Sequence, residues 1–193
     1  MKELLKSKRY MVNLGVITWL WMSAFMTAEI IALYSPPKSV TGDGYYADMF
    51  AALVDLAGYL ASGLLFGQFL IRKKFIFFLS YGAALVGTAG LVVTDNSQIS
   101  SDQSLNLGFK ILAQFGVASA YQGVFLMMDI FPGVFQSSTF GICNAFGLVS
   151  QILVLQALPR FLTKVESLYF AMAVMVVSMI LSPFLIGSHR LKL

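Results

Sequence analysis

Residues 75–94 read FIFFLSYGAALVGTAGLVVT, and these twenty positions contain no charged side chain. A helix needs roughly 20 predominantly apolar residues to cross the hydrocarbon core of a bilayer. Residues 111–128 and 130–159 are also free of charge. The whole chain is 58% hydrophobic and 11% charged, whereas soluble proteins average about 25% charged residues. The sequence therefore predicts an all-α, polytopic membrane protein with the lipid bilayer as its solvent.

Polar and proline-bearing stretches divide the 193 residues into six predicted membrane spans that form a single domain. The predicted spans lie near residues 11–34, 49–71, 75–94, 105–131, 138–159 and 167–187. The stretch Gly42-Asp43-Gly44, in the connector before the second span, is typical of a turn. An even number of spans places both termini on the same side of the membrane.

The basic residues are distributed unequally between the two sides of this predicted topology. Nine of the 13 fall on the side of the termini, and four fall on the other. The nine are Lys2, Lys6, Lys8, Arg9, Arg72, Lys73, Lys74, Arg190 and Lys192, and the four are Lys38, Lys110, Arg160 and Lys164. The positive-inside rule then places both termini in the cytoplasm or its topological equivalent. Orientation accounts for the net charge of +4, so no nucleic-acid partner is expected.

The first residues resemble a signal peptide, because four basic residues precede an apolar stretch. That stretch, residues 10–29, is longer than the 7 to 15 residues of a cleaved segment, so it is interpreted as a retained first span. A mitochondrial presequence is the alternative, against which the short basic segment and Glu3 argue. The sequence does not indicate which membrane holds the protein.

Enzymatic chemistry finds no support in the sequence. Cys143 is the single cysteine, which excludes an internal disulfide and a thiolate metal cluster. His189 is the single histidine and lies beside Arg190 in a basic tail. There is no paired metal-ligand spacing, no phosphate-binding loop and no nucleophile with a nearby base. We therefore expect no catalytic site, no metal and no cofactor.

Small residues recur in the second and third predicted spans and indicate close helix packing. They are Gly58, Ser62, Gly63, Gly67, Gly82, Gly87 and Gly90. Small residues let helix backbones approach one another within a membrane. A bundle is therefore expected, rather than six helices that each face lipid.

Two stretches carry a resemblance to a known family. Residues 52–59 read ALVDLAGY and are followed by the basic triplet of residues 72–74, RKK; farther on, FGVAS at 115–119, MDIFP at 128–132 and GIC at 141–143 occur in order. This pattern resembles the second half of the organic cation and anion transporters of the major facilitator superfamily. The sequence departs from the family pattern at Ala57, where proline is usual, and at Gln136, where a loop arginine is usual. It also has Leu148 where members often have a charged residue.

The resemblance implies a two-half transporter fold, of which this chain supplies only one half. Members have two six-helix halves, each built from inverted three-helix repeats, around a substrate site near the bilayer midplane. This chain has one half, so transport of organic ions or other small solutes requires completion by a second membrane chain or by self-association. Gln114, Gln122, Asn144 and Gln151 are polar positions that would meet the other half. The alternative is a non-transporting structural or accessory subunit of a membrane complex, derived from a transporter, and a truncated product is also open.

Candidate substrate-binding or gating residues are Glu29, Asp55, Tyr59 and Tyr121. Acids within spans are costly and often functional, and aromatic rings can hold organic cations. Glu29 is either a cation or proton site that faces a cavity or an acid near the membrane interface. Asp55 either contacts substrate or supports gating and packing. The two tyrosines lie in segments that match the family, although aromatic residues in spans more often serve packing.

Candidate residues for a cytoplasmic gate are Asp129, Arg72, Lys73 and Lys74. In the family, the counterpart of Asp129 helps to hold the inner gate through charge pairs with loop arginines. Gln136 weakens that comparison, and Asp129 as a helix cap is the alternative. The basic triplet either joins the gate or only sets orientation.

The topology is testable by cysteine labelling in a background that lacks Cys143. We expect a cysteine at position 73 to react from the side of the termini and one at position 40 to react from the opposite side. Labelling of both positions from the same side would contradict the six-span topology.

Overall fold

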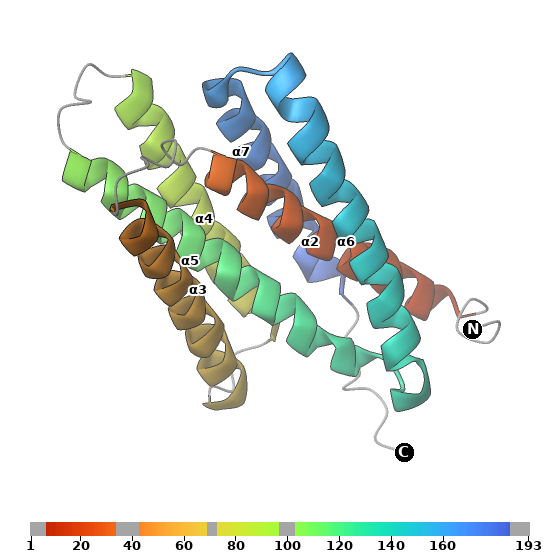
Figure 1. The fold of residues 1–193 in the computed structure, drawn as a ribbon. Helices are drawn as coiled ribbons and strands as arrows, with labels where there is room; N and C mark the ends of the chain where they lie inside the picture. The colour runs from red at the N-terminus through yellow and green to blue at the C-terminus, as the bar shows by residue number, and fades with distance from the viewer. Residues whose placement is uncertain (1–6, 34–42, 69–72, 97–102, 186–193) are drawn as a thin grey trace.

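The computed structural model describes residues 7–33, 43–68, 73–96 and 103–185, and these residues form helices with no strand. The helices, in order, are α2 (Lys8–Leu33), α3 (Asp43–Gln68), α4 (Lys73–Asn96), α5 (Gln103–Leu126), the 3₁₀ turn η1 (Met127–Ile130), α6 (Gly133–Phe161), α7 (Lys164–Leu181) and the 3₁₀ turn η2 (Ser182–Phe184). Consecutive long helices run in opposite directions (Figure 1). The predicted all-α class and the predicted number of long helices are confirmed for the described residues.

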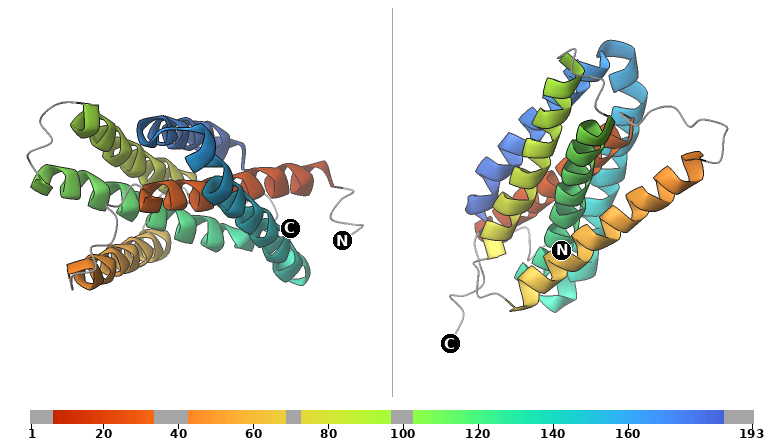
Figure 2. Two further views of the ribbon diagram at one scale, coloured as in Figure 1. Left: turned by 45° about the horizontal axis from the view of Figure 1, so that its top comes forward. Right: turned by 90° about the vertical axis from the view of Figure 1, so that its left-hand side faces the viewer.

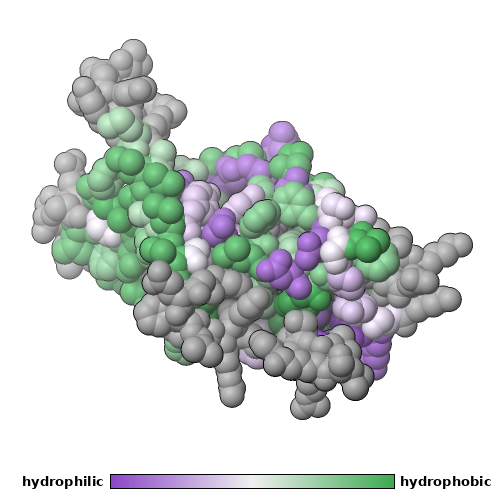
Figure 3. All heavy atoms as spheres, turned by 90° about the horizontal axis from the view of Figure 1, so that it is seen from below, coloured by the Kyte–Doolittle hydropathy of each residue, from purple (hydrophilic) through white to green (hydrophobic). Residues whose placement is uncertain are grey.

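Five of these helices are long and apolar enough to cross a membrane, and α3 adds a shorter apolar segment, Met49–Leu65. Large apolar side chains on the outside of the bundle remain exposed, including Leu53, Leu60, Leu64, Val93 and Ile180. Viewed from one end, part of the surface is almost continuously hydrophobic, whereas hydrophilic groups are interspersed elsewhere (Figure 3). A soluble monomer seldom exposes an apolar surface of this extent, but a lipid-facing one does.

Several helix boundaries differ from the prediction. The second helix begins at Asp43, so the predicted turn is wrong at Asp43 and Gly44, which are helical, while Gly42 lies outside the described residues. The last long helix begins at Lys164 rather than near 167, because Thr163 and Glu166 form a capping box. Ser or Thr followed three residues later by Glu is a sequence signature of a helix start. Here this pattern lies within residues 160–166, which were predicted to be a connector.

Only Phe131 and Pro132 separate η1 from α6, so this turn is shorter than the predicted connector of residues 132–137. Phe131 is extended, with φ −90° and ψ 146°, because the following proline disfavours helical geometry in the residue before it. The next helix begins at Gly133, not near 138. The Gln136 side chain donates a 3.2 Å hydrogen bond to the Phe131 carbonyl, so this residue stabilises the turn.

The six long helices pack with an internal symmetry. At the centre α2 packs against α5. Around this pair, α2 packs on α6 and α7, while α5 packs on α3 and α4, and α4 packs on α7. Exchanging α2 with α5, α3 with α6 and α4 with α7 reproduces these main contacts, whereas the small contact between α3 and α4 has no counterpart of that size between α6 and α7 (Figures 1 and 2). The three helices α2–α4 and the three helices α5–α7 are therefore equivalent units in the packing scheme.

Hydrogen bonds between side chains and backbone join the helices inside this core. Tyr81 of α4 is fully buried, and its hydroxyl donates to the Leu20 carbonyl of α2 at 2.9 Å. The same hydroxyl lies 2.7 Å from Ser23 Oγ. Ser80 and Ser119 pair at 2.9 Å between α4 and α5. These contacts satisfy polar groups that have no access to water, which is required in a bilayer.

The tightest helix contact joins α4 and α5, and it depends on glycine. A Cβ added at Gly87 would lie 2.7 Å from the Phe109 carbonyl oxygen, and one added at Gly116 would lie 2.7 Å from the Ser80 carbonyl oxygen. Each helix thus presents a glycine to the backbone of the other. Gly58 of α3 approaches α5 in the same way, with 2.8 Å to the Phe115 carbonyl oxygen. The predicted packing role is confirmed for Gly58 and Gly87, whereas Gly63 and Gly82 meet nothing within 4 Å.

We predict that Gly87→Ala and Gly116→Ala each destabilise the bundle by about 1–3 kcal/mol, since the added methyl group must push two backbones apart. Gly82→Ala on the same helix is the matched control. It should be neutral or slightly stabilising, because alanine favours helix by roughly 1 kcal/mol over glycine. Thermal unfolding of purified protein in mild detergent measures the difference. Equal melting temperatures for Gly87→Ala and Gly82→Ala would contradict the close contact.

Candidate functional site

Six aromatic side chains from four helices form one connected group, termed here the aromatic cluster. Its members are Trp21 and Phe25 of α2, Tyr59 of α3, Tyr121 and Phe125 of α5, and Phe140 of α6. Tyr121 is at its centre, with ring-centroid distances of 4.8 Å to Trp21, 5.3 Å to Phe25 and 6.2 Å to Tyr59. The cluster therefore spans the face made by α3, α5, α2 and α6.

Glu29 lies beside this cluster and has an amide partner. It follows Phe25 by one helical turn, so both side chains share one face of α2. The Gln151 side chain of α6 donates a hydrogen bond from Nε2 to Glu29 Oε1. The amide satisfies one carboxylate oxygen but does not neutralise the charge. Glu29 remains only partly buried, so the described residues leave part of the carboxylate uncovered.

Asp55 has a similar partner on the other side of the cluster. Gln114 of α5 donates from Nε2 to the Ala51 carbonyl at 3.1 Å, one turn before Asp55 on α3, and the same side chain lies close to the Asp55 carboxylate. Asp55 is half-buried and interacts electrostatically with Tyr59. It lies about 18 Å from either end of its helix at 1.5 Å per residue, which corresponds to the middle of the span.

These two acid–amide pairs follow the internal symmetry of the bundle. One pair joins α3 to α5, and the other joins α6 to α2, which are equivalent helix contacts. In the first pair the acid is on the peripheral helix, and in the second pair it is on the central helix. Both carboxylates therefore belong to the unit α2–α4 and both amides belong to the unit α5–α7, with the aromatic cluster on the same four-helix face.

Chemically, this face suits a cation with apolar surface. A carboxylate in a low-dielectric environment attracts a cation strongly, and aromatic faces contribute about 0.5–2 kcal/mol to binding of an organic cation. Lys110 lies one turn before Gln114 on α5. Glu29 and Asp55 together are two acids on this face, against the one basic side chain of Lys110.

The structure brings together three of the four predicted substrate residues: Asp55, Tyr59 and Tyr121 form one group through α3 and α5. Glu29 contacts Gln151 instead and lies one helical turn beyond Phe25, a member of the aromatic cluster. The sequence did not identify Phe25 and Phe140 as members, since single phenylalanines in apolar spans carry no distinguishing signal. Two other aromatic residues within the spans, Trp19 and Tyr81, are not members of the aromatic cluster. Trp19 Nε1 donates to Ser178 Oγ of α7 at 3.2 Å, and Tyr81 lies in the core.

The predicted cytoplasmic gate is described only in part. Asp129 is exposed on η1, at the end of the bundle where α4 begins (Figure 1). Arg72 and the side chains of Lys73 and Lys74 lie outside the described residues, so the gate stays a prediction. Gln136, in the position of the family's loop arginine, bonds to Phe131 and leaves Asp129 without a charge partner from α6.

Comparison of the chain with protein-family models, curated proteins and solved structures gives no match. The helices and their hydropathy define the class: an all-helical, multi-pass membrane protein.

A double-mutant cycle can measure the pairing of Glu29 with Gln151. We predict a coupling energy of about 0.6 kcal/mol, and below roughly 2 kcal/mol, as for hydrogen bonds between membrane helices. The variants are Glu29→Gln, Gln151→Leu and the double variant, compared by unfolding in detergent. Asn144→Leu, on the same helix, replaces Gln151→Leu in a control cycle that should give no coupling to Glu29. Additive effects of Glu29→Gln and Gln151→Leu would show that the pair is not formed.

Proposed function

We propose that this chain is one half of a solute transporter and that it binds organic cations on the face formed by α3, α5, α2 and α6. The observation that carries the proposal is the convergence of Glu29, Asp55 and the aromatic cluster on this face. Acids within spans are energetically costly and generally serve ion or substrate pathways. Here both acids lie beside aromatic rings, as a site for a cation with apolar groups would require.

The packing scheme supports the same proposal. Transporters are commonly built from repeats of opposite orientation that meet at a midplane site. Three-helix repeats invert when every helix spans the membrane, because an odd number of spans reverses the direction of the next unit. The exchange of α2–α4 with α5–α7 that preserves the main contacts fits such a pair of repeats. The resemblance of residues 52–59 and 115–143 to organic ion transporters agrees with this arrangement.

A single half has no opposing surface against which to alternate access. Two of the helices that form this face carry further polar residues, Gln122 on α5 and Asn144 on α6, and both are only partly buried. Polar groups at this depth are unfavourable next to lipid. The proposal therefore includes a second membrane chain, or a second copy of this one, on that face.

A structural or accessory subunit is the second candidate. The observation that favours it is the bond from Gln136 to Phe131, which replaces the expected gate charge with a local stabilising contact. A subunit kept for assembly would retain the fold and lose the moving gate. The two candidates differ in whether the acids are needed for uptake.

Uptake by protein reconstituted with its copurified partner tests the proposal. We expect Glu29→Gln and Asp55→Asn each to lower uptake of labelled organic cations at least tenfold, because each removes a charge that offsets the substrate's charge, while leaving the amount of assembled protein unchanged. Asp95→Asn is the matched control, since Asp95 is an exposed acid near the end of α4 and should not alter uptake.

Labelled organic anions, assayed in parallel, report on substrate charge. Anion uptake that survives both substitutions would replace the cation assignment. Wild-type vesicles with no uptake above empty vesicles, from an assembly that falls apart without this chain, would favour the structural subunit.

A further inference from the structure

A cavity of about 170 Å³ lies between the ends of α2, α6 and α7. Its walls are mostly apolar, from Ile30 and Leu33 of α2 and from Leu158, Pro159 and Leu162 around the end of α6. Two polar residues of the first turn of α7, Lys164 and Ser167, complete the lining. The cavity thus combines a hydrophobic interior with a single charged residue.

The charge of Lys164 is not neutralised by a described neighbour. The acid nearest in sequence, Glu166, accepts hydrogen bonds from the backbone N–H of Thr163 at 2.7 Å and from its hydroxyl at 2.8 Å. The Ser167 hydroxyl donates to the Thr163 carbonyl at 2.9 Å, so its proton is committed. Among the cavity's polar groups, the Lys164 ammonium is therefore the donor that remains for a ligand.

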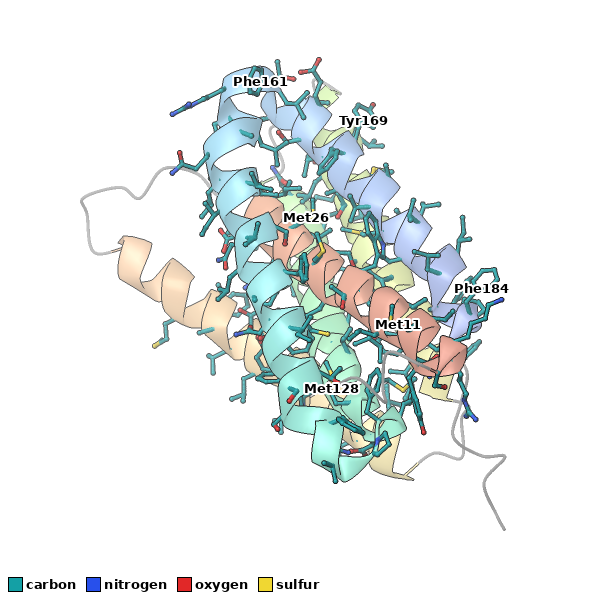
Figure 4. All side chains as sticks on the ribbon, turned by 90° about the vertical axis from the view of Figure 1, so that its right-hand side faces the viewer. Met11, Met26, Met128, Phe161, Tyr169 and Phe184 are labelled. Carbon is teal, nitrogen blue, oxygen red and sulfur yellow. The ribbon has the colours of Figure 1, made fainter. Side chains whose placement is uncertain are left out.

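The position of the cavity along the helices matches the depth of lipid headgroups. It lies where one spanning helix ends at Phe161 and the next begins at Lys164. Phe161 and Tyr169 mark this end of the bundle in Figure 4. Both side chains are exposed, Phe161 to 81%, as is typical of aromatic residues at a membrane interface. At this depth the Lys164 ammonium lies at the level of the lipid phosphates and attracts a headgroup of net negative charge.

The geometry points to a binding site for one anionic phospholipid, with its phosphate on Lys164 and part of an acyl chain in the cavity. The apolar walls exclude a free phosphate as the better occupant, since it would desolvate without filling them. The net positive rim favours an anionic headgroup over a zwitterionic one. This assignment is independent of the proposed transport function.

Native mass spectrometry of the purified protein, titrated with phosphatidylglycerol or phosphatidylcholine, tests the site. We expect one phosphatidylglycerol to be retained in preference to phosphatidylcholine. Lys164→Gln should weaken phosphatidylglycerol binding about fivefold, the typical effect of one basic residue at a membrane surface, and Lys164→Arg should restore it. Leu33→Trp, which places a ring in the cavity, should weaken binding of both lipids.

Arg160→Gln is the matched control, because it removes the same charge from an exposed position that does not line the cavity. It should leave lipid retention unchanged. Circular dichroism and gel filtration confirm that each variant keeps its fold. Equal phosphatidylglycerol binding by wild type and Lys164→Gln would overturn the proposal, and so would an equal loss in Arg160→Gln. Displacement of the lipid by millimolar inorganic phosphate would show that the acyl chain contributes nothing and would also overturn it.

Discussion

The backbones of α4 and α5 meet at Gly87 and Gly116, where a side chain on either helix would collide with a carbonyl oxygen of the other. This contact matters because helices in hydrocarbon gain little from the hydrophobic effect when they associate. Their stability comes from van der Waals contact, which falls off steeply with distance. The close approach of α4 and α5 brings α3 and α2 to the two sides of α5. The four-helix face with the acids and the aromatic cluster therefore depends on the close contact of α4 and α5.

The long helices could be predicted from residue type alone, because charge-free stretches such as residues 75–94 leave little choice in a membrane. Their ends could be predicted less well. The start of α7 depends on Thr163 and Glu166, a signal present in the sequence, whereas the start of α6 depends on the local geometry at Phe131. The second boundary follows from Pro132, which holds Phe131 extended and directly precedes the first residue of α6.

The candidate site was predictable in its polar members and not in its apolar ones. Asp55 and Glu29 are conspicuous because acids are rare in spans, and Gln114 and Gln151 because amides there need partners. Which amide meets which acid depends on the rotation of each helix about its axis, and that rotation is set by packing. The positions of Phe25 and Phe140 depend on the same rotations, since 17 phenylalanines occur in the chain and sequence does not separate those that face the site from those that face lipid.

In both acid–amide pairs of the four-helix face, the partner of the carboxylate is a neutral amide and not a positive charge. A glutamine donates hydrogen bonds and lowers the cost of holding a carboxylate in the bilayer, but it leaves the negative charge uncompensated. Replacing the amides by basic residues would compensate that charge internally and remove the attraction for a cation. Glu29 bonds to Gln151 and Asp55 lies close to Gln114, so amides of the unit α5–α7 hold both carboxylates of the unit α2–α4 in place. Under the proposed function, a bound organic cation, or a partner chain that supplies a positive charge, compensates these two acids, and this requirement is the link between the fold and a function that needs a second surface.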